Sequence, residues 1–329
     1  MISLATSLVN DIVRKNVNAC LDENRIGGGR FVKEFEDKVA KYMGVKHAIA
    51  VSSGSMADIV ALATLKVQYP NKTEVIVPAL TFIAHTNAIL INGLTPVFVD
   101  IGEDYQMGKF EINKNTLAVF PAHLLGKRCR VKADVPILED ACEAFGVWNL
   151  GDMGTFSFFP SHTITTGEGG MIITDNDIHA RIARQLMNHG RKSDDILEKF
   201  HFDHIGFNGK MSNILASIGC AVVSEADGVI EKRKKNVELY NKLLSGDWYA
   251  ESPHCYPYRY KTSQERDESL LRLSENGVEA RKLFSCIPIT EYGYSGSYPI
   301  AERIGDTGLF VPVHQDLTED DIEKVVSLL

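Results

Sequence analysis

The stretch that decides the fold is FSFFPSHTITTGEGG, residues 156–170, followed at once by the apolar run MIIT. We expect Gly169–Thr174 to form a strand, because apolar and β-branched residues bounded by glycines favour one. In the loop before it stands His162, and no lysine occurs between Lys132 and Lys192. An imidazole moves protons near neutral pH, but unlike a primary amine it cannot form an imine with an aldehyde. The loop therefore offers acid–base chemistry without a covalent anchor.

Outward from this loop, the first half of the chain alternates short apolar runs with longer helical patterns. Continuous apolar strands separated by helices favour a parallel sheet that is covered on both faces. A helix is predicted over Met56–Val67. The predicted strands are His47–Val51, Glu74–Val77, Pro96–Asp100, Leu117–Phe120 and Val135–Leu138.

From about Asn213 the pattern changes to long helical stretches, of which Ile214–Ser245 is the clearest. Leu317–Leu329 closes the chain as a short amphipathic helix, for which Asp316 or Thr318 is a suitable cap. We therefore predict a large domain over residues 1–212 and a smaller one over residues 213–329. The N-terminal segment is free to pack on the smaller domain.

Composition sets limits on function. A chain of 329 residues fits a large domain plus a smaller one, and its 44% hydrophobic content can supply a sizeable core. The net charge of -8 gives no basic footprint for nucleic acid. The densest basic cluster, Lys232–Lys235, lies in a helical pattern and is interpreted as a solvated helix face.

The six cysteines are scattered without any Cys-x-x-Cys pair, which argues against a disulfide framework and against a zinc or iron–sulfur site. We expect no metal. The N-terminus shows no secretory signal pattern, and no window approaches 18 uninterrupted apolar residues. These features predict a cytoplasmic protein with free thiols and no membrane span.

Two further segments carry polar groups at the ends of predicted strands. Ser52–Ala57 follows a strand and opens a helix, whose free N–H groups bind phosphate readily, although such a turn is more often only a cap. Ile137–Glu143 ends a buried strand on carboxylates, and a buried carboxylate needs a charged partner. Each signal is weak when it stands alone.

Taken together, these motifs resemble the DegT/StrS family of fold-type I, vitamin B6-dependent sugar aminotransferases, from about Gly27 to Leu317. The resemblance implies an α/β fold with a mostly parallel seven-stranded sheet between helices and a smaller C-terminal α+β domain. In most of the family a lysine at the position of His162 holds pyridoxal phosphate as a Schiff base. The sugar 3-dehydratase branch has lost that lysine. The chain is shorter than the usual member, and residues 126–135 and 147–154 are abbreviated.

The resemblance also implies roles for individual residues. Asp140 would hold the pyridinium nitrogen of the cofactor, and Glu143 is the acid that the dehydratase branch carries where aminotransferases have Gln or His. Asn208 would reach the phosphate of the neighbouring subunit in a homodimer. Arg281 is a candidate for substrate binding, with a surface ion pair as its equal competitor. The remaining expected cofactor contacts are Gly54, Ser55, Met56 and Ser157 at the phosphate and Phe82 on the ring. His123 is expected to orient the loop or to pack, not to catalyse.

The reaction implied is removal of the 3-hydroxyl from a nucleotide-linked 4-keto-6-deoxyhexose by a pyridoxamine/pyridoxal phosphate enzyme, for deoxysugars of surface polysaccharides such as lipopolysaccharide. His162 would be the acid/base, and an amino donor such as glutamate would restore the cofactor. Because Cys142 is followed by no cysteine until Cys220, the branch without an iron–sulfur cluster, that of colitose biosynthesis, fits better.

Two alternatives remain open. Residues 163–170 resemble perosamine-type aminotransferases, so the chain could be a sugar-nucleotide aminotransferase whose lysine is replaced by His162, naturally or by design; Glu143 argues against this. A non-catalytic relative that only binds cofactor or sugar nucleotide is the other. Retention of Asp140, Ser157 and Phe82 argues against that one.

Overall fold

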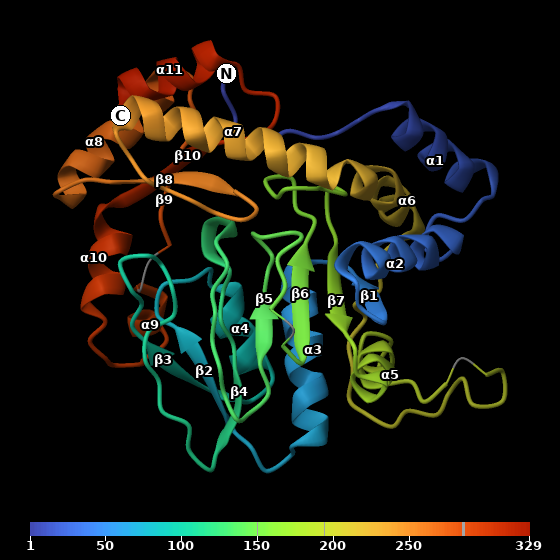
Figure 1. Cartoon of the computed structure of the whole chain (residues 1–329). Helices are drawn as coiled ribbons and strands as arrows, with labels where there is room; N and C mark the ends of the chain where they lie inside the picture. Colours follow the sequence, from blue (N-terminus) through green and yellow to red (C-terminus); the bar gives the residue numbers. More distant parts are fainter. Residues whose placement is uncertain (150, 194, 285–286) are drawn as a thin grey trace.

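The computed structural model describes residues 1–149, 151–193, 195–284 and 287–329, and its centre is a mostly parallel sheet (Figure 1). Hydrogen bonding gives a three-stranded part in the order β3-β2-β4 and a four-stranded part in the order β5-β6-β7-β1. Isolated parallel bridges, Val119 with Ile137 and Ala122 with Asp140, join β4 to β5, so that the two parts form one sheet of seven strands. Only β7 runs antiparallel to its neighbours among these described strands. The strands are β1 (His47–Val51), β2 (Glu74–Pro78), β3 (Thr95–Val99), β4 (Thr116–Val119), β5 (Leu138–Asp140), β6 (Met153–Ser157) and β7 (Gly170–Thr174).

Helices cover both faces of this sheet, as its continuous apolar strands predict. Along β1, Ala48 and Ala50 face one core cluster while Ile49 and Val51 face the other, because successive strand residues point to opposite faces. The first cluster includes residues of α1 (Asp11–Asp22), α2 (Arg30–Met43) and α6 (Asn213–Val222). The second includes residues of α3 (Gly54–Gln68), α4 (Ala84–Ile91) and α5 (Asp177–Leu186). The α/β fold with a seven-stranded sheet is thereby confirmed.

The C-terminal part has an antiparallel sheet of its own in the order β8-β10-β9. The chain start joins this part, since Ile2 pairs with Val278 and the Leu4 N–H donates to Glu279. Figure 1 shows the long helix α7 (Ala226–Leu244) running from α6 to this sheet. The other elements are η1 (Leu124–Gly126), η2 (Val223–Glu225), β8 (Cys255–Arg259), α8 (Ser263–Glu275), β9 (Arg281–Lys282), α9 (Ile287–Glu291), α10 (Pro299–Thr307), β10 (Gly308–Pro312) and α11 (Glu319–Leu328).

Some boundaries differ from the sequence prediction. The strand expected over Val135–Leu138 is β5 and begins only at Leu138, because Pro136 has no N–H to donate to a neighbouring strand. The helix expected over Ile214–Ser245 is broken into α6 and α7 by the short 3₁₀ turn η2. For α11, the structure selects Thr318 as the cap, since its side chain accepts from the Asp321 N–H in a capping box.

The interpretation of Lys232–Lys235 as a solvated helix face is wrong for one member. Arg233 is only 1% exposed and points into the protein, whereas Lys232 and Lys235 are exposed. The whole stretch Asn213–Leu244 is long and apolar enough to cross a membrane, yet 61% of its most apolar window is buried inside the fold. It therefore serves here as core helix.

Candidate active site

A cavity of about 340 Å³ lies at the carboxyl ends of β5 and β6, where open α/β sheets usually bind their ligands. Its lining joins segments that are far apart in sequence, including the start of α3, the loop that carries His162 and the beginning of β8. The predicted site residues that line it are Gly54, Ser55, Phe82, Asp140, Glu143, Ser157, His162 and Arg281.

The first turn of α3 forms one wall of the cavity. Ser53 caps the helix, its hydroxyl oxygen accepting from the Met56 N–H at 3.1 Å. A Cβ on Gly54 would stand 2.6 Å from the Cβ of Ser157 and 2.9 Å from the Sγ of Cys142, so only glycine fits between α3 and β6. The exposed Ser55, the nearby Ser157 and the positive end of the helix dipole together make a wall suited to a phosphate.

Asp140 ends β5 as a firmly ionised carboxylate. Its Oδ2 lies 3.0 Å from the Nε2 of His85, and its Oδ1 accepts from the Cys142 N–H at 2.8 Å. Burial alone would raise its pKa, but His85 and the Cys142 N–H outweigh this and lower the pKa to about 2. His85 is held in turn by the Thr81 hydroxyl, 2.7 Å from Nδ1. Such a carboxylate suits a cationic ring nitrogen.

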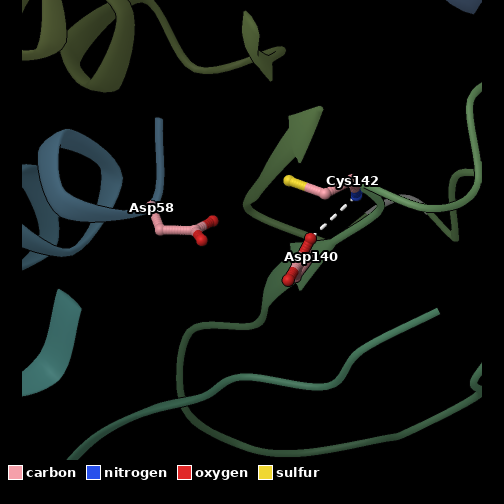
Figure 2. Close-up of side chains that lie close together, drawn as sticks. All are labelled: Asp58, Asp140 and Cys142. Atoms are coloured by element: carbon pink, nitrogen blue, oxygen red, sulfur yellow. Dashed lines mark hydrogen bonds between the residues drawn. The ribbon is translucent and has the colours of Figure 1, made fainter. Parts of the chain in front are cut away.

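Asp58 and Cys142 gather beside Asp140, with polar atoms that all lie within 4.8 Å of one another (Figure 2). Asp58 is buried and accepts from the Thr155 hydroxyl at 2.7 Å. Burial, and then Asp140, raise the pKa of Asp58 and that of the Cys142 thiol well above their ordinary values. With Asp140 as the one anion of the three, the cluster lacks the charge that a Ca²⁺ or Mg²⁺ site draws from several oxygen ligands.

His162 lies in the loop after β6 and has an unpartnered nitrogen. Its Nδ1 is buried without a hydrogen bond. The main chain around it is fixed, because its N–H donates to the Phe159 carbonyl at 3.0 Å and its carbonyl accepts from Arg233 at 2.9 Å. Burial lowers the pKa of His162 to about 4; the Arg233 charge also lowers it, and Asp140 opposes both. At neutral pH the imidazole is therefore uncharged and can act as a base.

Beside His162 lies a second imidazole that the sequence analysis missed. His254 is 5% exposed and lines the cavity, with ring centroids 5.1 Å apart between the two histidines. Its Nε2 is 3.6 Å from the Oε1 of Glu143, and the Oε2 of Glu143 accepts from the Leu125 N–H at 2.6 Å. Burial raises the pKa of Glu143 to about 8. Glu143 lies in a turn rather than on a helix, and its side chain is half-buried at the edge of the cavity.

Two predicted cofactor contacts, Met56 and Asn208, do not line the cavity. Met56 packs against Gly209 and does not line the cavity, and Asn208 is exposed outside it, accepting from Lys210 at 2.7 Å. Their contacts with a cofactor stay predictions. His123 also borders the cavity and is buried with its Nε2 2.8 Å from Glu139; its orienting or packing role stays a prediction.

The position of Arg281 is compatible with both of its interpretations, and its contact with a substrate stays a prediction. It lines the cavity, and it also forms an exposed ion pair with Glu279 at 2.9 Å. An exposed pair of this kind contributes little to stability, so the guanidinium can exchange Glu279 for a substrate oxygen at small cost.

Comparison with known proteins identifies the family. Residues 9–329 match the DegT/DnrJ/EryC1/StrS aminotransferase family. This chain belongs to that family. Among its DegT/DnrJ/EryC1/StrS relatives, GDP-perosamine synthase of Caulobacter vibrioides is 35% identical and the alignment covers 100% of this chain and 97% of the relative. GDP-4-keto-6-deoxy-D-mannose 3-dehydratase of Yersinia pseudotuberculosis is 29% identical, over 99% of this chain and 97% of the relative.

Solved structures give the same picture. The E. coli GDP-4-keto-6-deoxy-D-mannose-3-dehydratase with bound hydrated pyridoxal phosphate superposes with a TM-score of 0.91 at 27% identity, covering 100% of this chain and 99% of that one. A histidine-to-asparagine variant of GDP-4-keto-6-deoxymannose-3-dehydratase with bound GDP-perosamine has the same TM-score and identity, with full coverage of both chains.

Proposed function

We propose that this chain is a pyridoxamine/pyridoxal phosphate-dependent 3-dehydratase that removes the 3-hydroxyl of a nucleotide-linked 4-keto-6-deoxyhexose. The observation that carries the proposal is His162, which occupies the expected anchor position, borders the cavity and has an Nδ1 without a hydrogen-bond partner. No lysine is found among the cavity-lining residues in the described part of the chain. Dehydration is the family chemistry that needs a proton-transfer group there and no amine.

The cavity fits this cofactor. Gly54, Ser55 and Ser157 form the wall for its phosphate, and Asp140 offers an anion to its ring nitrogen. Phe82 borders the cavity with 56% of its surface exposed, and a ring stacked on it would cover that surface. When bound, the cofactor supplies an amine for the sugar ketone and an electron-accepting ring.

His162 carries the proton transfers in this proposal. With the cofactor bound, the neutral imidazole of His162 would serve as the base beside it, and the same group could return a proton to the departing 3-hydroxyl of the sugar. Because burial keeps the pKa of His162 near 4, the base form predominates throughout the physiological range. Asp140, fixed by His85, keeps the ring nitrogen protonated.

We further propose that the working unit is a homodimer in the cytoplasm, with glutamate as amino donor. The segment between α5 and α6 exposes large apolar side chains, among them Ile196, Leu197, Phe200 and Ile205 at 80% to 98% exposure. Clustered exposed apolar residues are typical of an interface. Asn208 follows this segment and would then lie at the partner's phosphate wall.

The second candidate is a sugar-nucleotide aminotransferase. It is favoured by the higher identity to GDP-perosamine synthase, 35% against 29% for the 3-dehydratase. Against it, an aminotransferase would have to regenerate its cofactor without a lysine at position 162. The third candidate, a non-catalytic relative, gains no support from a cavity that brings Asp140, Ser157 and Phe82 together.

The deciding experiment incubates the protein with glutamate, pyridoxal phosphate and a panel of nucleotide-linked 4-keto-6-deoxyhexoses, followed by mass spectrometry. Loss of one oxygen at C3 without nitrogen gain supports dehydration, whereas nitrogen gain supports transamination. A protein that binds neither form of the cofactor would be the non-catalytic relative.

Two variants at position 162 test the role of the imidazole. His162→Asn should keep cofactor affinity and lose about 10²–10⁴ in the dehydration rate, the usual worth of a positioned acid–base group. His162→Lys should bind pyridoxal phosphate covalently, as a borohydride-reducible mass increase, and lose dehydration. If His162→Asn dehydrates at the parent rate, His162 is not the base.

A further inference from the structure

We propose that Glu143 and His254 form a buried proton-donating pair, in which His254 Nδ1 delivers a proton into the cavity beside His162. The inference rests on the proposed dehydration and deepens it. It gives the acid role toward the departing hydroxyl to His254 and leaves His162 as the base.

One strained turn holds both members of the pair. Leu125 lies in η1 with a φ of 57°, a left-handed conformation that is unusual for a non-glycine residue. Its N–H donates to Glu143 Oε2 at 2.6 Å, and its carbonyl accepts from the His254 N–H at 3.2 Å. The main chain of this one residue thereby holds the carboxyl of Glu143 3.6 Å from the Nε2 of His254.

The neighbouring glycine shows how tightly this turn docks. Gly126 has a φ of 87°, and a Cβ on it would stand 1.8 Å from the Ser252 carbonyl oxygen. The Gly126 carbonyl in turn accepts from the Ser252 N–H at 3.1 Å. The segment that leads into His254 is thus fastened to η1 on both sides, which fixes the imidazole relative to Glu143.

His254 borders the cavity and has one ring nitrogen without a partner. Its Nδ1 is buried without a hydrogen-bond partner, like the Nδ1 of His162. Buried polar nitrogens are rarely left unpaired, and a molecule bound in this cavity would supply a partner to each of the two. Both histidines and Glu143 belong to the cavity lining.

The pKa values of Glu143 and His162 suit these two groups to different roles in the proton transfer. Burial raises the pKa of Glu143 to about 8, so this carboxyl is mostly protonated at pH 7. Burial lowers the pKa of His162 to about 4, so that imidazole is mostly neutral. Two groups whose surroundings push their pKa values in opposite directions are suited to act as acid and base in one site.

The groups around His254 keep it neutral as well. Burial lowers its pKa well below the ordinary value, followed by His162, Arg233 on α7 and Arg281 on β9. The titratable neighbour with opposite sign is Glu143, which also faces Asp140. In the proposed state the Glu143 proton is directed at His254 Nε2, which lies 3.6 Å from Oε1, just beyond hydrogen-bond length, so the two side chains approach each other for the transfer. The ring hydrogen of a neutral His254 is then on Nδ1.

The proton transfer balances within the pair. The C3–O bond breaks with its electrons on oxygen, which takes the proton from His254 Nδ1 and leaves as water. The Glu143 proton moves from Oε1 to Nε2, and the resulting carboxylate stays hydrogen-bonded to the Leu125 N–H. His162 keeps the proton it removed from carbon, and exchange with solvent returns one proton to Glu143 before the next turnover.

The test measures dehydration rate against pH for the wild type, Glu143→Gln and His254→Asn. The wild-type rate should fall above pH 8 as Glu143 loses its proton. The dehydration rate of each variant should be about 10²–10⁴-fold lower than that of the wild type, and neither variant should show the fall in rate above pH 8. Because the two residues act as one unit, the double variant should be no slower than either single one. His179→Asn is the matched control, a buried histidine on α5 bonded to Gln68 that should keep the wild-type profile.

Nuclear magnetic resonance of the full chain without cofactor gives a second readout. Labelled His254 should show a neutral ring with its hydrogen on Nδ1 at pH 7, and the Glu143 carboxyl should titrate near pH 8. Single variants that dehydrate at the wild-type rate with an unchanged basic limb would overturn the pair while leaving dehydration intact. If the wild type does not dehydrate the sugar, the proposed function fails. The magnetic resonance experiment tests the pair separately: a Glu143 carboxylate that is ionised at pH 6, or a His254 ring hydrogen on Nε2, would overturn it. Glutamine has nearly the same shape as glutamate. The pH profile of Glu143→Gln therefore tests the pair even if His254→Asn does not fold.

Discussion

Replacing Arg233 with methionine should destabilise the protein and disturb the proposed base at the same time. The guanidinium is 1% exposed and donates to the carbonyls of His162 at 2.9 Å, Pro253 at 3.2 Å and His254 at 3.4 Å. It therefore connects the loop after β6 to the segment before β8. The main-chain carbonyls of His162 and His254 are both held by this one side chain.

The magnitude follows from opposing contributions. Each buried carbonyl left without a donor costs about 1–3 kcal/mol. Removing a buried cation recovers part of its desolvation, since burial already lowers the pKa of Arg233 to about 10. Methionine also fills much of the same volume. We expect a net loss of about 2–4 kcal/mol in the free energy of unfolding.

Urea denaturation at pH 7 measures this loss, and the dehydration assay measures the displacement of His162. Arg233→Lys is the control, because lysine keeps the charge but lacks the planar fork that reaches several carbonyls. It should recover part of the stability and little of the rate. If Arg233→Met unfolds at the wild-type urea concentration and keeps the wild-type rate, Arg233 does not organise the site.

Other expectations follow from single contacts. Gly54→Ala should weaken cofactor binding in a fluorescence titration, because its Cβ would stand 2.6 Å from Ser157, and such overpacking costs about 1–3 kcal/mol. Glu143 should make the protein less stable as pH rises from about 4.5 to 8, by at most about 1.4 kcal/mol per pH unit, since the native state holds a proton that the unfolded state has lost. In Glu143→Gln, urea denaturation at pH 6 and pH 8 should show a flatter dependence. Gly126→Ala should lower the urea midpoint, because its Cβ would overlap the Ser252 carbonyl; an unchanged midpoint would contradict the docking of this turn.

Local sequence signals predicted much of the fold, whereas the resemblance to the family supplied most of the candidate site residues. The strand β1 was predicted with its observed bounds, since apolar and β-branched residues between polar ones specify a strand without help from distant segments. Gly54, Asp140 and Ser157 were predicted from the resemblance to the family; they line the cavity, and their contacts with a cofactor stay predictions. β5 begins later than predicted because Pro136 has no N–H to donate. The apolar run that contains this proline nevertheless favoured a strand from Val135.

The missed residues act through tertiary contacts. Arg233 stands in a basic run on α7 that reads as a solvated face, and only the packing of α7 over the loop after β6 turns this side chain inward. His254 precedes β8 with no motif around it, and its partner Glu143 lies more than a hundred residues away. Asp58 occupies a core position of an apolar helix, where a carboxyl is not expected from the sequence. Its burial is explained by the hydrogen bond that it accepts from the Thr155 hydroxyl, a contact between distant segments.

These missed contacts also explain why the proposed chemistry needs the whole chain. The residues that would bind the cofactor, such as Asp140, come from the central sheet, but the unpartnered nitrogen of His254 comes from the segment before β8. Arg233 and the Leu125 peptide connect these parts through main-chain carbonyls and N–H groups. A substitution of the side chain of Leu125 can preserve those bonds, whereas removal of the Arg233 guanidinium cannot. A cavity with cofactor affinity but a lowered proton-transfer rate is therefore the expected state whenever the contact between α7 and the His162 loop is loosened.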